Sequence, residues 1–344
     1  MQKKEEKLWD LYSLYLLTKV WFPSCVRFSE TLSGKVKHDK INRFLEKNEK
    51  WWKELFEEVK KYITFEWWIL HINDSVTDKI YSWLWKSDLT WRYYSWKHHK
   101  IVQWIAIVTL FYTDTNWIKL PVNYRIVEKS NWKTKNELFL KMLEEVLIWW
   151  IKPSMVTWDS WYSWGENLNF LIKQWIDFLF WLKSNRLICK KWEIWKFQQI
   201  SDTELNNNWE IVYLKWVSFV KVFEKDENYY AYYNWKAKDK KDDSKLENFW
   251  KEEFENTKKK HWDIENYHRC IKQVCNIEWH RFRNRWAIKG HFYYSLRAFC
   301  ILEVNRSLWK FKNWYSYIFD STRSIIKNAL SNISISNLVL AWLN

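Results

Sequence analysis

Glycine is nearly absent from this chain of 344 residues, which contains 3 Gly and 32 Trp. Globular proteins average about 7% Gly, so roughly 24 would be expected here. Tight turns that need a positive φ use Gly because it lacks a Cβ atom, and Asn-Gly is the strongest short hairpin signal. The sequence has no Asn-Gly, and Trp follows Asn instead at Asn116-Trp117, Asn131-Trp132, Asn208-Trp209, Asn234-Trp235 and Asn313-Trp314.

These positions indicate that many Trp residues stand where the backbone requires Gly. Some genetic codes read the codon UGA as Trp and others read it as Gly. We therefore interpret many of these Trp residues as Gly in the cell, since a bulky residue forced to positive φ costs about 1–3 kcal/mol. The alternative is a truly Trp-rich protein, whose aromatic surfaces would bind sugars or single-stranded nucleic acid.

The remaining composition describes a basic protein with enough apolar residues for a large core. Hydrophobic residues make up 48% of the chain, no apolar run reaches about 18 residues, and the first ten residues do not resemble a secretory signal. Five scattered Cys indicate a reducing compartment rather than a disulfide framework. The net charge of +15 favours a polyanionic partner, above all nucleic acid. We expect a cytoplasmic, nucleoid-associated bacterial protein that does not contact membranes.

Strand and helix patterns alternate in the middle of the chain. Apolar runs bounded by turn residues predict strands at 67–74, 101–113, 118–127, 153–158 and 176–182. Two capping boxes, Thr134 to Glu137 and Ser163 to Glu166, predict helices that run to about 148 and 174. The order β-β-β-α-β-α-β implies an α/β (α+β) fold in which helices flank a mixed sheet.

Three acidic residues stand out because of where they fall in this pattern. Asp74 ends the first predicted strand, Asp159 follows a later strand, and Glu265 lies on a predicted helix. Carboxylates placed at neighbouring strand ends and on a facing helix can hold two Mg²⁺ ions, which prefer oxygen ligands. Two such ions can activate the attacking oxygen and stabilise the leaving oxygen in phosphodiester displacement.

Four blocks in order resemble insertion-sequence DDE transposases of the branch with a Y-R-E-K signature. The helix that runs from His261 through Glu265 to Lys272 resembles the W-x-I-E-x-aromatic-H-K/R signature of that branch. The other blocks are Asp74 with Lys79 and Tyr81, Thr134-Lys-Asn-Glu-Leu138 followed by Asp159-Ser-Trp-Tyr-Ser163, and Leu182-Lys-Ser-Asn-Arg186. The resemblance covers about residues 30–305.

This resemblance implies a ribonuclease H-like catalytic domain that cuts the ends of a transposon and joins them to target DNA. It implies that Asp74, Asp159 and Glu265 are the catalytic residues and ligate Mg²⁺, or alternatively Mn²⁺. It also implies that Lys272 contacts a phosphate, with His268 and Arg269 at basic positions of the same helix. The partners would be the terminal inverted repeats and the target DNA, bound by a homodimer in a synaptic complex.

The sequence departs from the signature at two positions. The Tyr and Arg expected seven and four residues before Glu265 are Lys258 and His261. Both can still bind phosphate, but Tyr stacking and the bidentate contact of Arg are lost. Asn73 stands where a second Asp is common. Trp161 and Trp262 stand where this family has Trp, whereas Trp104, Trp181 and Trp216 stand where a small residue is usual.

The resemblance divides the chain into four parts. We expect a helical DNA-binding domain over 1–62, a ribonuclease H-like catalytic domain over 63–182 and 251–305, a β-rich insert over 183–250, and a helical C-terminal tail over 306–344. Lys40 and Arg43 lie on the polar face of an N-terminal helix that suits a helix-turn-helix reader or an ordinary surface helix. Arg281, Arg283 and Arg285 form a basic cluster that tracks a DNA backbone or is a solvated connection.

Two functional alternatives to a transposase remain at this point. One is a ribonuclease H-fold nuclease that cuts without joining DNA. The other is an inactive, DNA-binding relic of a transposon, which the substitutions at Lys258 and His261 keep open. The complete set of three acids favours an active enzyme.

Overall fold

The structure is a computed structural model of the chain. It describes residues 2–18, 22–47, 51–64, 68–78, 89–95, 99–114, 118–128, 130, 133–149, 152–191, 196–206, 209–237, 244–249, 251–308, 313–316, 324, 326–328 and 330. Lys79 and Tyr81 and the last part of the predicted C-terminal tail lie outside these residues.

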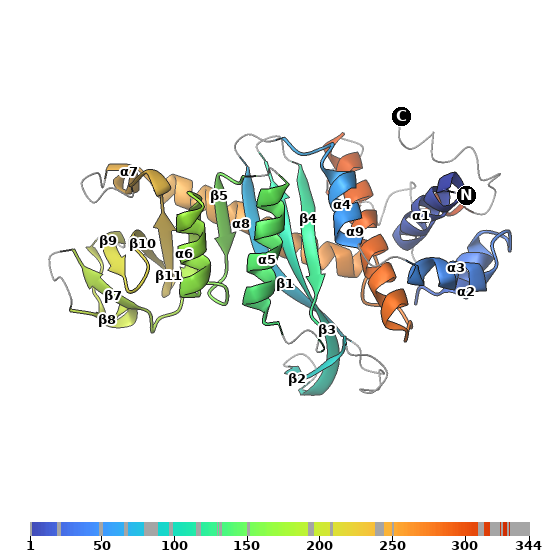
Figure 1. The fold of residues 1–344 in the computed structure, drawn as a ribbon, viewed down its shortest axis with the longest axis horizontal. Coiled ribbons are helices and arrows are strands. Elements are labelled where there is room, and N and C mark those ends of the chain that lie inside the picture. Colours follow the sequence, from blue (N-terminus) through green and yellow to red (C-terminus); the bar gives the residue numbers. More distant parts are fainter. Residues whose placement is uncertain are drawn as a thin grey trace.

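Five strands form the central sheet (Figure 1). They are β1 (Ile69–Asp78), β3 (Lys100–Thr113), β4 (Lys119–Ile126), β5 (Met155–Trp158) and β6 (Asp177–Leu182). β1 pairs antiparallel with β3 and parallel with β5, β3 pairs antiparallel with β4, and β5 pairs parallel with β6. The strand order is β4-β3-β1-β5-β6, with parallel and antiparallel neighbours, so the predicted fold class of a mixed sheet flanked by helices is confirmed.

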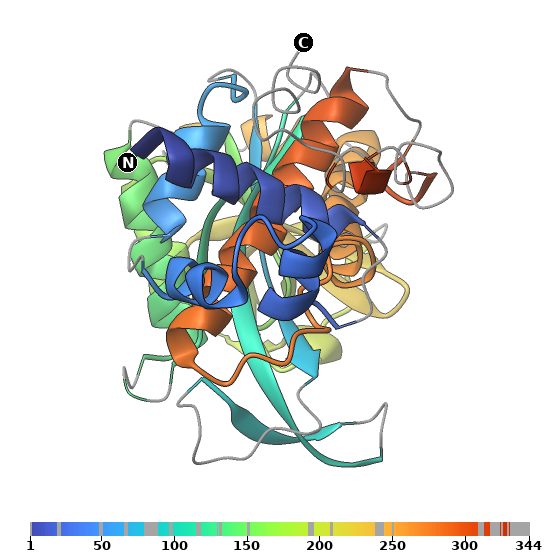
Figure 2. The ribbon, with the colours of Figure 1, turned by 90° about the vertical axis from the view of Figure 1, so that its right-hand side faces the viewer.

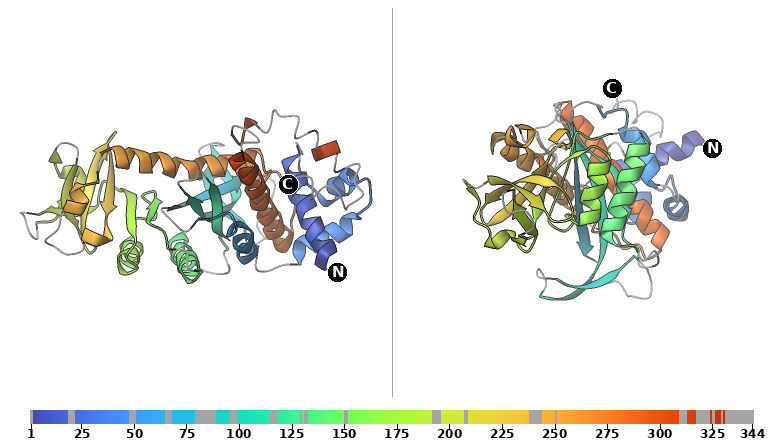
Figure 3. Two further views of the ribbon diagram at one scale, coloured as in Figure 1. Left: turned by 90° about the horizontal axis from the view of Figure 1, so that it is seen from above. Right: turned by 60° about the vertical axis from the view of Figure 1, so that its left-hand side comes forward.

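Helices cover both faces of this sheet. Seen from above, α5 (Lys135–Ile148) and α6 (Gly165–Lys173) lie on one face, and α8 (Lys251–Gln273) runs along the other (Figure 3). α5 contacts β3 and β4, whereas α8 contacts β1. The strands are therefore apolar on both sides, and every residue of β3 from 105 to 113 is buried. Burial on two faces explains why this strand reads as a continuous apolar run.

The two predicted capping boxes have different outcomes. At Thr134 the box is present, because the Thr134 hydroxyl accepts from the Glu137 amide and the Glu137 carboxylate accepts from the Thr134 amide. The box predicted at Ser163 is wrong. α6 begins at Gly165 with Trp164 as its N-cap, and the Ser163 hydroxyl donates to the carbonyl of Ser160 at 2.8 Å instead. A local turn thus uses the hydroxyl that the helix end would need.

The β-rich insert continues the central sheet. Its strands are β7 (Leu187–Lys190), β8 (Gln198–Gln199), β9 (Trp209–Leu214), β10 (Phe219–Lys225) and β11 (Asn228–Tyr233). β11 pairs antiparallel with β6, so the sheet extends through β10, β9 and β7 to β8. Two 3-10 turns (Ile200–Asp202 and Trp235–Ala237) and α7 (Ser244–Glu247) complete the insert. A separate apolar cluster joins it to the start of α8 through Phe223 and Phe254.

Strand β2 (Trp91–Ser95) was not predicted from the sequence. It pairs with the first residues of β3, from Lys100 to Trp104, and this ribbon projects below the rest of the sheet (Figure 2). Its five residues, Trp-Arg-Tyr-Tyr-Ser, show no clear apolar alternation and are shorter than the runs that identified the other strands.

The N-terminal helices pack against the last long helix. They are α1 (Gln2–Leu17), α2 (Cys25–Thr31), α3 (His38–Glu46) and α4 (Trp51–Val59), and α9 spans Arg285–Ser307. α1, α3 and α4 contact α9, and their buried residues belong to the same apolar core as the central sheet (Figure 2). Tyr12 bonds His291 at 3.1 Å, and Arg297 pairs with Glu58 at 2.6 Å. None of the helices among the described residues is long and apolar enough to cross a bilayer.

Gly290 sets the distance between α3 and α9, because a Cβ atom there would clash with the backbone of Leu45. We expect Gly290→Ala to lower the free energy of unfolding by about 1–3 kcal/mol, as overpacking does. Gly165→Ala is the matched control, since a Cβ at Gly165 meets nothing within 4 Å. Denaturant unfolding measures both variants. Equal stabilities for the two would contradict the close helix crossing.

Candidate catalytic site

Two of the predicted acidic ligands belong to neighbouring parallel strands: Asp74 lies within β1, and Asp159 directly follows β5. In the β1–β5 ladder Ile72 faces Trp158. Asp74 follows Ile72 by two residues and Asp159 follows Trp158 by one, so both acids lie at the same end of the strand pair. Glu265 comes from α8, which packs over β1. The fold thus brings together three residues that are far apart in the sequence.

Asp74 points toward the face of the sheet that α5 covers. The Tyr162 hydroxyl donates to its Oδ1 atom at 3.0 Å, and the Lys135 ammonium lies 2.5 Å from its Oδ2 atom. The Lys135 and Asp74 side chains are 27% and 16% exposed, which makes this a partly buried ion pair. Lys135 is in the first turn of α5, and the capping box at Thr134 fixes where that turn begins.

Glu265 is held from the other face of β1. The side-chain amide of Asn73 donates to Glu265 Oε1 at 2.5 Å, while Asn73 Oδ1 accepts from the Asp74 amide at 2.7 Å. Successive side chains of a strand point to opposite faces, so Asn73 reaches α8 and Asp74 reaches α5. Two adjacent residues of one strand therefore fix the carboxylates of Asp74 and Glu265.

Asp159 experiences the charge of both other acids. Burial raises the pKa of Asp159 above its usual value, and the negative charges of Asp74 and Glu265 raise it further. The backbone amide of Trp161 opposes this shift by donating to Asp159 Oδ1 at 2.9 Å. Asp159 is therefore close enough to Asp74 and Glu265 for their charges to affect its protonation.

The donor chemistry of this neighbourhood suits a divalent cation. Its three carboxylates are hard oxygen donors, which Mg²⁺ prefers, and their repulsion is only partly offset by Lys135. Among the described residues, no three His, Cys, Asp or Glu side chains lie close enough together to coordinate one ion as they stand. Lys135 occupies the position of a counter-ion to Asp74, and its displacement would free that carboxylate.

Sequence reasoning missed several residues that hold the acids. Lys135 and Tyr162 both belong to blocks that carried the resemblance, but no role had been assigned to them. The Trp161 side chain is 57% exposed. The Lys135 and Lys183 ammonium groups lie 5.8 and 5.5 Å from the centroid of its ring. Both Lys135 and Tyr162 could have been noticed in the sequence because they lie in these blocks. Their contacts with Asp74 become evident only in the three-dimensional structure.

The predicted basic residues of α8 lie in different environments. His268 is 4% exposed, and burial lowers its pKa to about 3, so it is a neutral core residue rather than a DNA contact. His261 is half-buried and its Nδ1 atom lies 2.9 Å from the Thr157 hydroxyl. Arg269 is exposed, and Lys272 lies 3.5 Å from Glu278. The Lys258 ammonium lies 4.7 Å from the Tyr230 ring.

A model of the transposase DDE domain matches residues 74–301, which is more than half of the chain and includes all three acids. The chain belongs to the transposase DDE domain family. No curated protein sequence matches it. The matched segment of this transposase-family chain begins at Asp74 on β1 and ends within α9.

The fold of this family member is also similar to a solved transposase structure. The similar chain comes from a cryo-EM structure of a piggyBac transposase synaptic complex with hairpin DNA. The TM-score is 0.51 at 9% sequence identity, over 98% of this chain and 74% of the other. At 9% sequence identity this similarity shows that the two chains share a fold.

Other predicted DNA contacts of this DDE-family chain lie at the surface. Arg281 and Arg283, which precede α9, are exposed, and the Arg281 guanidinium lies 4.4 Å from the Phe22 ring. Arg285 pairs with Glu128 at 2.6 Å. Lys40 and Arg43 are exposed on α3. The exposed members of this set remain predictions as DNA contacts.

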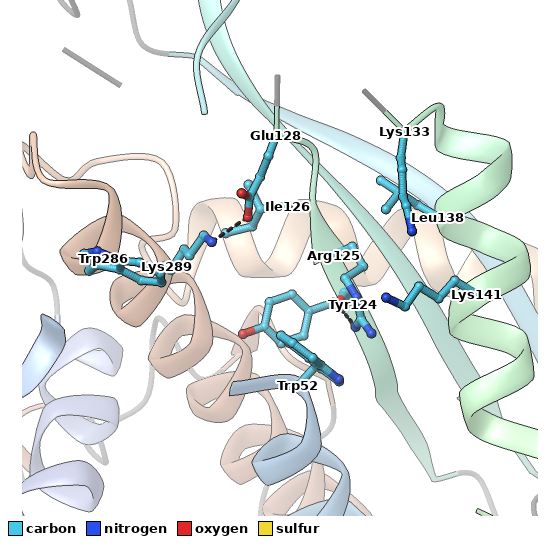
Figure 4. Close-up of a pocket in the computed structure, with 10 residues that line it drawn as sticks. All are labelled: Trp52, Tyr124, Arg125, Ile126, Glu128, Lys133, Leu138, Lys141, Trp286 and Lys289. Carbon is cyan, nitrogen blue, oxygen red and sulfur yellow. Dashed lines mark hydrogen bonds and ion pairs between the residues drawn. The ribbon is translucent and has the colours of Figure 1, made fainter. Parts of the chain in front are cut away.

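A cavity lies between α4, β4, α5 and α9, and none of the three acids lines it (Figure 4). Its volume is about 360 Å³, and both aromatic and cationic side chains line it. Lys289 pairs with Glu128 at 2.5 Å, and Arg125 forms an ion pair with Glu145 and lies 4.1 Å from the Trp52 ring. These internal ion pairs offset much of the positive charge of the cavity. The cavity is therefore a weaker candidate for a functional site than the three carboxylates.

Proposed function

We propose that this protein is a DNA transposase that cleaves transposon ends and joins the freed 3′-hydroxyls to target DNA. The observation that carries the proposal is the convergence of Asp74, Asp159 and Glu265 from β1, β5 and α8, expressed in the raised pKa of Asp159. Membership of the transposase DDE domain family supports it. We also propose that the chain belongs to the branch with the Y-R-E-K signature and acts on an insertion sequence.

In this proposal the three carboxylates hold Mg²⁺, or alternatively Mn²⁺. The bound ions would activate the attacking oxygen and stabilise the leaving oxygen of the scissile phosphodiester. The chain's own residues set the geometry, since Tyr162 and Lys135 orient Asp74 and Asn73 orients Glu265. Lys135 neutralises Asp74 and is placed to move to a DNA phosphate once that carboxylate has another partner.

Three exposed arginines and the half-buried Lys272, which lies 3.5 Å from Glu278, supply the proposed DNA surface. Arg269 and Lys272 lie on α8 beyond Glu265, and Arg281 and Arg283 follow in the connection to α9. His268 is left out because it is buried, and Arg285 because it pairs with Glu128. We infer that two copies of the chain hold paired transposon ends in a synaptic complex, the kind of assembly in which the similar piggyBac transposase was solved with hairpin DNA.

A nuclease that cuts without joining is the second candidate, because its site would have the same carboxylates. A strand-transfer assay on paired-end DNA separates the two, since only a transposase yields joined product. An inactive relic would show neither cleavage nor joining while still binding DNA. The hydrogen bonds that orient Asp74 and Glu265 favour an active site.

The cleavage test is Asp159→Asn. We expect this variant to lose Mg²⁺-dependent cleavage by at least about 10³-fold, because it loses an anionic metal ligand, while end binding stays within a few-fold. Gel assays with labelled transposon ends measure cleavage and binding separately. Asp202→Asn, at an exposed acid of the insert, is the control and should cleave normally. Cleavage that survives in the Asp159 variant would remove this residue from the site.

We also propose that many Trp residues are Gly in the native protein. Trp175 has φ 60° directly after α6, where Ile176 donates to the Leu171 carbonyl and Trp175 to the Ile172 carbonyl. These two hydrogen bonds define a Schellman motif, in which Gly normally occupies the Trp175 position. Trp216 has φ 64° in the turn between β9 and β10 and is 78% exposed.

Trp216→Gly tests this interpretation in the protein made with Trp. We expect the free energy of unfolding to rise by about 1 kcal/mol, because Gly relieves the strain of positive φ. Trp262→Gly is the control, since Trp262 is also exposed but lies in the interior of α8, where Gly should lower the free energy of unfolding by about 1 kcal/mol. Peptide masses of the native protein give the direct check. Trp at position 216 in those peptides would refute recoding there.

A further inference from the structure

One threonine hydroxyl lies between two histidine rings beneath the carboxylates. Thr157 Oγ1 is 2.6 Å from His71 Nδ1 and 2.9 Å from His261 Nδ1. The two rings approach each other edge to face, with centroids 5.7 Å apart. His71 and Thr157 are buried, and they face each other directly in the β1–β5 ladder.

These three residues come from the same three elements that carry the acids. His71 lies on β1 three residues before Asp74, and Thr157 lies on β5 two residues before Asp159. His261 lies on α8 one turn before Glu265. Hydrogen bonds through a single hydroxyl therefore connect β1, β5 and α8 close to the site.

Both histidine rings of the cluster are neutral. The Thr157 hydroxyl has one donor and two acceptor positions, so it can donate to one imidazole and accept from the other, or accept from both. Burial lowers the pKa of His261 to about 4 and holds the pKa of His71 well below its usual value. The cluster thus adds no positive charge beside a cation site, whereas the Arg of the signature at position 261 would.

We propose that His71, Thr157 and His261 form a clasp that holds β1, β5 and α8 together, limits how far the three carboxylates can separate, and so raises the affinity of the site for divalent ions. This inference rests on the proposed function. The three residues are positioning residues, because they act through the elements that carry Asp74, Asp159 and Glu265. A purely structural role for the same contacts would affect stability but not metal affinity.

Thr157→Val removes the hydroxyl and keeps the shape of the side chain. We expect the full-length variant to bind Mn²⁺ about tenfold more weakly, as when the outer hydrogen-bond partners of metal ligands are removed. Cleavage should then need about tenfold more metal, with end binding unchanged. Thr157→Ser keeps the hydroxyl and should restore most of the affinity. Electron paramagnetic resonance of free Mn²⁺ measures the binding affinity. Cleavage of transposon ends at a series of Mn²⁺ concentrations measures how much metal the reaction needs.

Thr113→Val is the matched control. Thr113 is 3% exposed on β3, and its hydroxyl has no hydrogen-bond partner within the described part of the chain. This variant should keep the Mn²⁺ affinity of the original protein. Equal Mn²⁺ affinities for Thr157→Val and Thr113→Val would overturn the clasp.

His261→Leu and His261→Asn keep the proposal testable if Thr157→Val does not fold. Leu removes the bond to Thr157, whereas Asn can place a polar atom near the position of Nδ1. We expect His261→Leu to bind Mn²⁺ more weakly than the original protein and His261→Asn to recover part of the affinity. If both variants bind Mn²⁺ as tightly as the original protein, the clasp is refuted. An original protein that neither binds Mn²⁺ nor cleaves DNA would instead refute the proposed function, which separates the two failures.

Discussion

The electrostatic cost of gathering three carboxylates is the constraint on which the candidate site depends. Asp159 is half-buried, and desolvation together with the negative charges of Asp74 and Glu265 raises its pKa. The chain holds each acid through a different donor: Lys135 and Tyr162 for Asp74, Asn73 for Glu265, and the Trp161 amide for Asp159. The Lys135 ammonium offsets the charge of Asp74, and a divalent ion can balance the charge of the remaining carboxylates.

The surrounding architecture follows from the need to bring these residues together. β1 and β5 are parallel neighbours although β2, β3 and β4 lie between them in the sequence. α5 returns the chain from β4 to β5 and places Lys135 at Asp74. α8 is 23 residues long and runs from the insert to the central sheet, which carries Glu265 back across β1 (Figure 3). The insert strands extend the sheet from β6 and so anchor the start of this helix.

Much of the central fold could be predicted because its signals are local. Apolar runs mark β1, β3, β4 and β6, and the capping box at Thr134 marks the start of α5. Strand β2 lacked such a pattern, and the Ser163 hydroxyl is used by a turn that no local rule separates from a cap. Local signals decide secondary structure where tertiary contacts do not override them.

The site was predicted less completely for a different reason. The three acids could be found from the resemblance, but the prediction that Asp74 ends its strand was wrong, because pairing with β3 carries β1 on to Asp78. The partners of the acids depend on distant contacts. Lys135 reaches Asp74 from another element, and nothing in the neighbouring sequence specifies that pairing. His268 lies at a basic position of the signature yet faces the core, because its side of α8 packs inward. Burial of a helix face is a property of the assembled fold.

The most direct measurement is an experimental structure of the full chain with transposon-end DNA and Mn²⁺, in which anomalous scattering locates the ions. We expect Mn²⁺ between the carboxylates of Asp74, Asp159 and Glu265, with two ions about 3.5–4 Å apart and Lys135 moved away from Asp74. Ions bound elsewhere, or a Lys135–Asp74 pair that persists beside the DNA, would contradict the catalytic assignment of this site.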